Sequence, residues 1–356
     1  MEPLGGKSLR ARWPCVCFAS VLLFGCSSSD ADVTRAIATS IVNGNDDRVE
    51  FFDAPAGSPE RAIVKQASVA LMSRENAERL LQGRIEELPT WSTLDALCEG
   101  EPFAEQASAA FCSGTLLDDD LVLTSNHCFR TQPFGSWVVV FDYFYEASGV
   151  LGVQAEDIYE AESVVVAEER DPESGEGADY AWIRLGTPVE ASRRPAPVFR
   201  RGAQKLAVNQ PLVSASAGGG VPIKLDLGAS IRELRAPDYD YFVADTDTSR
   251  GSSGAGAFTR ELEFVGVLVR GGADFVETSE GCFRTARPQK PTEQFTHVHR
   301  AVNGLCEVAA SAGLCRESKT EASASSGCSL ARRGEVSSIV LIASAAVALR
   351  TRRRRR

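Results

Sequence analysis

The sequence predicts an all-β fold built from antiparallel strands. Short runs rich in valine, leucine and aromatic residues recur along the chain, and acidic or glycine-rich turns separate them. The clearest runs are Phe111–Leu117, Leu121–Cys128, Trp137–Phe141 and Phe264–Gly272. The 356 residues, 44% hydrophobic and 24% charged, have an ordinary globular composition. They are enough for one large all-β domain or two smaller ones.

A histidine follows two neighbouring strand candidates. Three aspartates separate Phe111–Leu117 from Leu121–Cys128, and His127 lies at the end of this second run beside Cys128. Cys128 can reach back to Cys112, and such a disulfide would hold the histidine in place. The segment resembles the histidine region of trypsin-like (chymotrypsin-fold) serine proteases. Taken alone, it is also compatible with a plain disulfide-linked hairpin.

An aspartate opens a later strand candidate. Asp179 lies at the start of the apolar run in Gly177–Leu185, where a carboxylate can be partly buried and hold the second nitrogen of a histidine ring. The run resembles the aspartate strand of the same family. Three other aspartates are rivals on sequence alone: Asp142, Asp157 and Asp171.

A serine between glycines is the third motif. Gly251-Ser252-Ser253-Gly254 resembles the Gly-x-Ser-Gly nucleophile motif, and glycines there let the backbone turn tightly and direct N–H groups into one cavity. The resemblance implies that Ser253 is the nucleophile and that the amides of Gly251 and Ser253 form the oxyanion hole. The order His127, Asp179, Ser253 is that of the chymotrypsin family, not that of α/β-hydrolases.

The resemblance implies a fold and a function. The fold is two antiparallel β-barrels of the chymotrypsin/trypsin type over residues 61–316, with a short C-terminal helix and the active site between the barrels. The function is an exported serine endopeptidase that acts on proteins or peptides and needs no cofactor. One alternative is an inactive homologue that serves as a surface binding module. Another is a serine esterase in which Ser253 works with His297 or His299, which are otherwise expected to be exposed strand residues.

The substrate preference is left open by the sequence. Asp247 lies six residues before Ser253, where trypsins carry the aspartate that binds Lys or Arg. However, Arg270 could pair with Asp247, and Glu293 stands where a small residue would keep the pocket open. The sequence is compatible with cleavage after Lys or Arg, with cleavage after other residues and with no cleavage. Three residues of the strand after the serine are expected to face the peptide: Val269, Arg270 and Gly271.

Six cysteines belong to the expected exported domain: Cys98, Cys112, Cys128, Cys282, Cys306 and Cys315. An even number outside the cytoplasm predicts up to three disulfides. Cys112 is expected to pair with Cys128, by resemblance as well as spacing. Cys306 could pair with Cys315 around a closing helix and leave Cys98 with Cys282, although other pairings remain open.

The N-terminus has the pattern of a secretory signal. Basic residues precede an apolar run, Val16–Phe24, which ends before Gly25 and Cys26. The ending resembles a bacterial lipobox, which would make Cys26 the lipid-bearing residue of the mature protein. An ordinary signal peptide is the alternative. Residues 1–25 are thus a predicted signal and 26–60 a flexible spacer.

Within the spacer, Ile41-Val42-Asn43-Gly44 looks like the new N-terminus of an activated trypsin-like zymogen. Ser40 precedes it instead of a basic residue, and Ser252 stands where the zymogen switch needs an aspartate. The segment is therefore interpreted as a first β-strand.

The C-terminus has the pattern of an anchor. Residues 317–327 have linker composition, and 328–356 contain Cys328, the mostly apolar run Val336–Leu349 and a final arginine cluster. This tail resembles the MYXO-CTERM class of sorting tails, with a simple membrane anchor as the alternative. Together with the signal, it predicts a protein exported to the cell envelope or surface.

Charge and histidine content argue against other functions. The net charge is −10 although the terminal segments are basic, so the middle of the chain is strongly acidic and unsuited to nucleic acid. The chain has three histidines and no Cys-x-x-Cys or His-Glu-x-x-His spacing, so no metal site is predicted. Residues 73–110 have partly helical character and are interpreted as an insertion.

Overall fold

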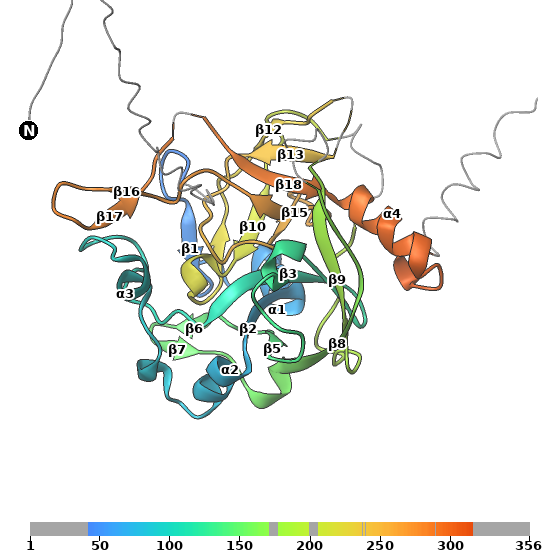
Figure 1. Ribbon diagram of the computed structural model, residues 1–356, viewed down its shortest axis with the longest axis horizontal. Coiled ribbons are helices and arrows are strands. Elements are labelled where there is room, and N and C mark those ends of the chain that lie inside the picture. Colours follow the sequence, from blue (N-terminus) through green and yellow to red (C-terminus); the bar gives the residue numbers. More distant parts are fainter. Residues whose placement is uncertain are drawn as a thin grey trace, which may run out of the picture. The chain divides into compact units, whose positions relative to one another are not determined.

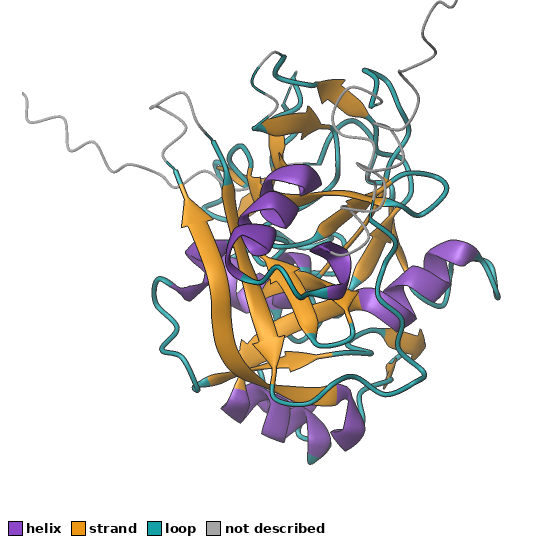
Figure 2. Cartoon of the chain, turned by 90° about the vertical axis from the view of Figure 1, so that its right-hand side faces the viewer, coloured by secondary structure: helices purple, strands orange, loops and turns teal. Residues whose placement is uncertain are grey.

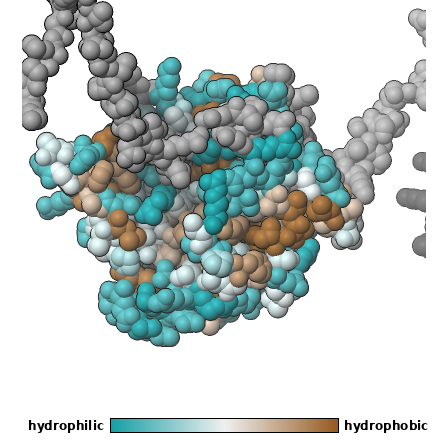
Figure 3. Space-filling model, in the orientation of Figure 1, coloured by the Kyte–Doolittle hydropathy of each residue, from teal (hydrophilic) through white to brown (hydrophobic). Residues whose placement is uncertain are grey.

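The computed structural model describes residues 42–170, 177–198, 206–236, 238, 240–288 and 290–315. Most of the strand residues belong to two antiparallel sheets, with short helices around them (Figures 1 and 2). One large apolar core fills the first sheet and extends into the second, and a smaller one lies within the second sheet. The side chains on the face shown in Figure 3 are mostly hydrophilic, with a hydrophobic area over the region of the C-terminal helix.

The first sheet is a closed barrel of six strands. Around the barrel these are β2 (Ser68–Ser73), β3 (Ala110–Asp118), β4 (Leu121–Thr124), β9 (Asp179–Leu185), β8 (Ile158–Glu169) and β5 (Trp137–Val140). Helices α1 (Pro59–Ala67) and α2 (Arg74–Leu81) flank β2 in sequence and contact it. The strand is therefore buried over nearly its whole length, which explains its continuous apolar run.

The second sheet has eight strands and is not closed. Their order is β1 (Arg48–Glu50), β11 (Lys224–Asp226), β10 (Val213–Ser216), β14 (Gly256–Phe258), β15 (Phe264–Arg270), β18 (Glu293–His297), β13 (Tyr241–Ala244) and β12 (Ile231–Glu233). Helix α4 (Val298–Val308) follows β18 directly, and its Ala301 carbonyl accepts a hydrogen bond from the indole of Trp182. The predicted all-β class, two-barrel arrangement and C-terminal helix are confirmed, although the second barrel is an open sheet.

The remaining elements are short. They are the hairpin strands β6 (Tyr145–Ala147), β7 (Val150–Leu151), β16 (Phe275–Glu277) and β17 (Phe283–Thr285), helix α3 (Trp91–Asp95), and the 3-10 turns η1 (Ile85–Glu87), η2 (Asn126–Phe129), η3 (Ala155–Asp157) and η6 (Gly218–Gly220). Between β2 and β3 the chain forms α2, η1 and α3, so the predicted helical insertion is present. The three suggested disulfides also form: Cys98–Cys282, Cys112–Cys128 and Cys306–Cys315.

The predicted spacer is partly wrong. Residues 42–60 belong to the fold, since β1 pairs with β11, the ring of Phe51 stacks on Phe144 and Ser58 caps helix α1. The predicted strand at 41–44 is also wrong, because Val42–Gly44 is irregular and β1 begins at Arg48. Residues 1–41 and 316–356 lie outside the described residues, and with them the signal, Cys26 and the tail. In the described part of the chain, no helix has the length and hydropathy needed to span a membrane.

A buried arginine links the loops at one end of the first barrel. The Arg193 guanidinium donates to Asp142 at 2.6 Å, to the Lys65 carbonyl at 2.5 Å and to Asp157. It also lies over the ring of Phe141. Asp142 and Asp157, two of the three sequence rivals of Asp179, therefore neutralise Arg193. The third rival, Asp171, lies outside the described residues.

Replacing Arg193 tests this arrangement. Arg193→Gln leaves two carboxylates buried without their cation, so we expect a loss of about 3–5 kcal/mol in the free energy of unfolding. The control is Arg74→Gln, which breaks an exposed pair with Glu160 and is expected to change stability by less than about 1 kcal/mol. Urea unfolding with the disulfides intact measures both. Equal effects would contradict the central role of Arg193.

Candidate active site

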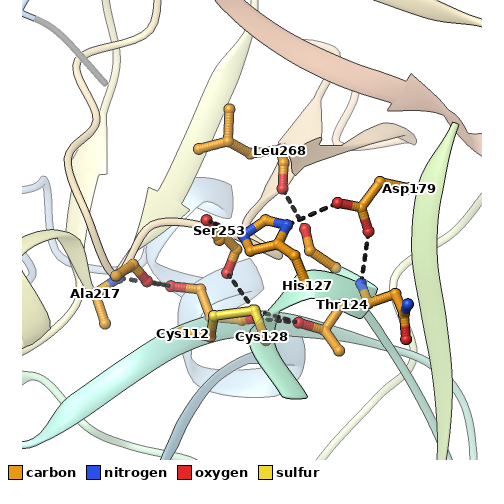
Figure 4. Close-up of a disulfide and its surroundings, with 12 residues drawn as sticks. Cys112, Thr124, His127, Cys128, Asp179, Ala217, Ser253 and Leu268 are labelled. Carbon is orange, nitrogen blue, oxygen red and sulfur yellow. Dashed lines mark hydrogen bonds and ion pairs between the residues drawn. A yellow bond between two sulfur atoms is a disulfide. The ribbon is translucent and has the colours of Figure 1, made fainter. Parts of the chain in front are cut away.

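His127 lies between a carboxylate and a hydroxyl. Its Nδ1 is 2.7 Å from Oδ2 of Asp179, and its Nε2 is 2.8 Å from Oγ of Ser253 (Figure 4). The residue belongs to η2, directly after β4, and the Cys112–Cys128 disulfide ties η2 back to β3. The three residues predicted from sequence are thus brought together.

Hydrogen bonds to both sheets hold the two residues that precede η2. The Thr124 hydroxyl donates to the carbonyl of Ser113 on β3, and the Ser125 hydroxyl donates to the carbonyl of Leu268 on β15, both at 2.7 Å. The Leu268 carbonyl also accepts the N–H of Gly254 at 2.8 Å. These bonds position His127 relative to the serine loop, and sequence reasoning did not identify them.

Asp179 is buried at the start of β9, with 2% of its surface exposed. Its Oδ1 accepts the N–H of Asn126 at 2.7 Å, while Oδ2 faces His127. The Thr296 hydroxyl of β18 lies 3.0 Å from the Asp179 N–H and 2.9 Å from its carbonyl. This carboxylate is therefore oriented to keep a proton on Nδ1 of His127 and to leave Nε2 as the acceptor for Ser253. Sequence analysis missed the parts played by Asn126 and Thr296.

The amides of Gly251 and Ser253 are the predicted oxyanion donors, and the carbonyls of the same two peptides fix where they point. The C=O and N–H of a trans peptide point in opposite directions. The Arg250 carbonyl accepts from the N–H of Gly219 at 2.6 Å, and the Ser252 carbonyl accepts from the N–H of Ala255 at 2.8 Å. The N–H groups of Gly251 and Ser253 therefore point away from these contacts, and neither donates to another group among the described residues.

Gly251 has a conformation that favours glycine. Its φ is +98°, and a Cβ would lie 2.6 Å from the carbonyl oxygen of Ala217. A side chain would therefore be strained and would also displace the neighbouring turn. This explains the glycine that the motif requires before the two serines.

Asp247 faces the N-terminal segment. Its Oδ1 accepts the N–H of Asn43 and its Oδ2 that of Asp47, both at 2.7 Å, and only 2% of the residue is exposed. Its own N–H donates to Asp226 at 2.7 Å. This contradicts the prediction that Asp247 contacts substrate, because both carboxylate oxygens are already bonded to the protein.

The environment of Asp226 and Asp247 disfavours the charged forms of both carboxylates. Burial raises the pKa of Asp226 to about 7, and the charge of Asp247 adds to the effect. Burial also raises the pKa of Asp247 to about 6, although backbone amides act in the other direction. Both groups therefore favour the protonated form more than an ordinary aspartate does.

The predicted peptide-facing residues lie at the end of β15. Val269 is buried, Gly271 is partly exposed, and Arg270 donates to Gln294 at 2.9 Å and to the carbonyl of Gly177. Since Gly177 lies two residues before Asp179, Arg270 contributes to fixing the start of β9. The guanidinium also lies over the ring of Tyr241.

His297 is buried, contrary to the expectation of an exposed strand residue. It is 1% exposed, and its ring packs against Phe242 and His299. Burial, with a smaller contribution from His299, lowers its pKa to about 3. The histidine in contact with Ser253 is His127, so the esterase alternative that used His297 or His299 is not supported.

One cluster near the site has the composition of a metal site. Ligand atoms of Cys112, His127 and Cys128 lie within 4.8 Å of one another. However, the two sulfurs are joined in a disulfide, and both nitrogens of His127 are in contact with Asp179 and Ser253. These residues therefore do not fit a metal ion.

The pH dependence of stability tests the carboxylate pair. In the folded protein the pKa of Asp226 exceeds the value of about 4 for an unfolded aspartate, so the folded state binds more protons between these values. Its contribution to the free energy of unfolding therefore falls as the pH rises from about 4 to about 7. When the pH is raised from about 5 to about 8, we expect the free energy of unfolding to fall by about 2 kcal/mol less in Asp226→Asn than in wild type.

Urea unfolding of wild type and Asp226→Asn at about pH 5 and about pH 8 measures this difference in the free energy of unfolding. Buried histidines such as His297 contribute equally to both proteins and cancel. The same pH dependence in wild type and variant would contradict the raised pKa.

Comparisons with known proteins found one family model and several similar solved structures. Residues 112–267 match the family model of the trypsin-like peptidase domain. Among solved structures, the chain is similar to the VesB protease of Vibrio cholerae (16% identity, TM-score 0.45, covering 75% of this chain and 67% of VesB). It is also similar to the secreted serine protease VesC of Vibrio cholerae (16%, 0.45, 70% and 45%) and to an inactive form of Rv3671c from Mycobacterium tuberculosis (15%, 0.40, 76% and 97%). The family match contains His127, Asp179 and Ser253, and it supports a trypsin-like serine peptidase domain in this part of the chain.

Proposed function

We propose that this protein is an exported serine endopeptidase that hydrolyses peptide bonds with His127, Asp179 and Ser253. The observation that carries the proposal is the position of the His127 ring, 2.8 Å from the Ser253 hydroxyl and 2.7 Å from a buried carboxylate. Nε2 can accept the hydroxyl proton, while Asp179 stabilises the imidazolium that results. Three disulfides agree with an oxidising compartment.

The reaction proceeds through an acyl-enzyme. As Oγ of Ser253 attacks the substrate carbonyl carbon, Nε2 of His127 takes its proton, and the amides of Gly251 and Ser253 stabilise the oxyanion. His127 then gives the proton to the leaving amine as the peptide C–N bond breaks. Water, deprotonated by His127, hydrolyses the ester and restores Ser253.

The substrate backbone is proposed to lie along β15. Strand β14 pairs with β15 only as far as Val267, whereas β18 continues to pair with it to Arg270. The edge nearer Ser253 is therefore the side on which an extended peptide could add as a strand. The backbone of Val269, Arg270 and Gly271 is proposed to face the peptide, since the Val269 side chain is buried.

We favour cleavage after residues other than Lys and Arg. Both oxygens of Asp247 accept backbone N–H groups, and Arg270 places a cation among the proposed peptide-facing residues. Glu293 is fully buried and accepts a hydrogen bond from the Thr248 hydroxyl at 2.5 Å. The carboxylates of Asp247 and Glu293 therefore do not lie on a surface that a basic side chain can reach.

A peptide library tests this preference. We expect wild type to show no enrichment of Lys or Arg before the cleaved bond, and Asp247→Asn to show the same profile, because the carboxylate already binds protein amides. Cleavage sites are identified by mass spectrometry. Enrichment of basic residues in wild type that is lost in Asp247→Asn would restore Asp247 as the specificity residue.

Labelling with a fluorophosphonate tests the catalytic residues. We expect wild type to be labelled and Ser253→Ala and His127→Ala to remain unlabelled, with kcat lowered by about 10⁴-fold or more. The matched control is His299→Ala, which removes a histidine outside the proposed site and is expected to be labelled as wild type. Circular dichroism and disulfide mapping establish that each variant is folded.

An unlabelled but folded wild type would contradict the proposal and favour the surface binding module. Labelling that survives in His127→Ala but not in His299→Ala would favour the esterase alternative instead.

A further inference from the structure

We propose that Ser113, a buried serine on β3, positions the oxyanion hole from the first barrel. The inference rests on the proposed peptidase function and adds a residue that holds the catalytic backbone without touching the substrate. It would also explain how the serine loop is kept in an active conformation although Ser252 stands where a zymogen-type switch needs an aspartate.

Ser113 makes three hydrogen bonds to loops between strands of the second sheet. Its hydroxyl donates to the Gly251 carbonyl at 2.9 Å and accepts the N–H of Ala217 at 2.9 Å. Its backbone N–H donates to the Ser253 carbonyl at 2.8 Å. Ser113 is 1% exposed, so water does not compete for these bonds. Figure 4 shows the surroundings of two of the partners, Ala217 and Ser253.

The peptides on both sides of Gly251 are thereby fixed. The Ser113 hydroxyl holds the carbonyl of Gly251, and the N–H of Gly219 holds the carbonyl of Arg250. Because the Arg250 carbonyl points toward Gly219, the N–H of Gly251 must point the other way. Rotation of this peptide would break the bond to Gly219 and remove one oxyanion donor.

The turn that contains Gly219 is supported by the insertion. The Ser108 hydroxyl donates to the Gly219 carbonyl at 2.7 Å. Gly219 has φ +67°, and a Cβ would lie 2.3 Å from the ring of Trp91 on α3. The Cys98–Cys282 disulfide joins the insertion to the second half of the chain. The insertion therefore contributes to the hole through Trp91 and Ser108.

The residue between Gly251 and Ser253 is held by uncharged groups. Ser252 is fully buried, its hydroxyl lies 3.0 Å from the Ser216 hydroxyl, and it accepts the N–H of Ser249 at 3.1 Å. These contacts, with those of Ser113, hold the loop in the observed conformation without an ion pair at Ser252. The arrangement therefore needs no freed N-terminal amine.

The chain offers a matched control in Ser214. Like Ser113, it is 1% exposed, and its hydroxyl donates to a glycine carbonyl, that of Gly256, at 3.0 Å. It lies on β10, and Gly256 lies on β14, beyond the serine loop. The two Ser→Ala changes thus remove the same kind of bond, but only one of them touches the oxyanion loop.

The experiment compares Ser113→Ala and Ser214→Ala in the full chain with p-nitrophenyl acetate as the probe. For Ser113→Ala we expect kcat to fall by about 10- to 100-fold, below the range of about 10²- to 10³-fold for complete loss of one oxyanion donor. KM is expected to stay within about twofold, and the pH midpoint of kcat within a few tenths of a unit. Ser214→Ala is expected to keep kcat within about twofold.

A fall in kcat that is equal in the two variants, or a shifted pH midpoint in Ser113→Ala, would overturn the proposal. If Ser113→Ala does not fold, Ser108→Ala tests the same turn from the insertion, and we expect its kcat to fall by about 3- to 10-fold. Unchanged kcat in that variant would overturn the proposal as well. Failure of the proposed function is distinguishable, because wild type would then hydrolyse neither the probe nor the peptides of the library, or would hydrolyse the probe alone.

Discussion

The hydrogen bonds between β3 and the serine loop join the two halves of the site. His127 and Asp179 belong to the first barrel, and Ser253 lies in the second half of the chain, so their contacts require that the two parts meet in one geometry. Ser113 bonds to the loop through its N–H and its hydroxyl, and Ser125 bonds to Leu268 nearby. These polar groups are buried, and an unpaired buried donor or acceptor is unfavourable by about 1–3 kcal/mol. Alternative arrangements of the two parts are therefore disfavoured.

The N-terminal segment completes the second half of the structure. Strand β1 pairs with β11, and Glu50 lies 3.3 Å from the Lys224 ammonium group in a buried ion pair. Burial lowers the pKa of Lys224 to about 8, while the charge of Glu50 acts in the opposite direction. Nearby, Asp247 accepts amides of the same segment. A residue at the position of a trypsin specificity aspartate thus serves to bind the chain's own backbone.

The insertion and the glycine turn give the serine loop a second support. Trp91 packs against Gly219, whose N–H holds the Arg250 carbonyl, and Arg250 itself pairs with Asp95 of α3 at 2.7 Å. The segment that lengthens a loop in the sequence therefore lies against the proposed catalytic backbone. Through these contacts the insertion takes part in the proposed positioning of the oxyanion hole.

Local patterns in the sequence were enough to predict much of this protein. The apolar runs predicted strands such as β4, β5 and β15, the cysteine spacing suggested three disulfides that form, and the motifs around His127, Asp179 and Ser253 named residues that meet in the structure. Each of these signals depends on neighbouring residues or on a motif, so it can be recognised without the fold.

Only the tertiary structure decided the partner of Asp247, the burial of His297 and the place of residues 42–60. The carboxylate of Asp247 binds Asn43, which is 204 positions away, and His297 is covered by side chains that include Phe242. In the sequence, Ser113 is an ordinary residue of a predicted strand. The bond from its hydroxyl to Gly251 spans 138 positions. Such contacts depend on how distant segments pack, and no local spacing or periodicity carries that information.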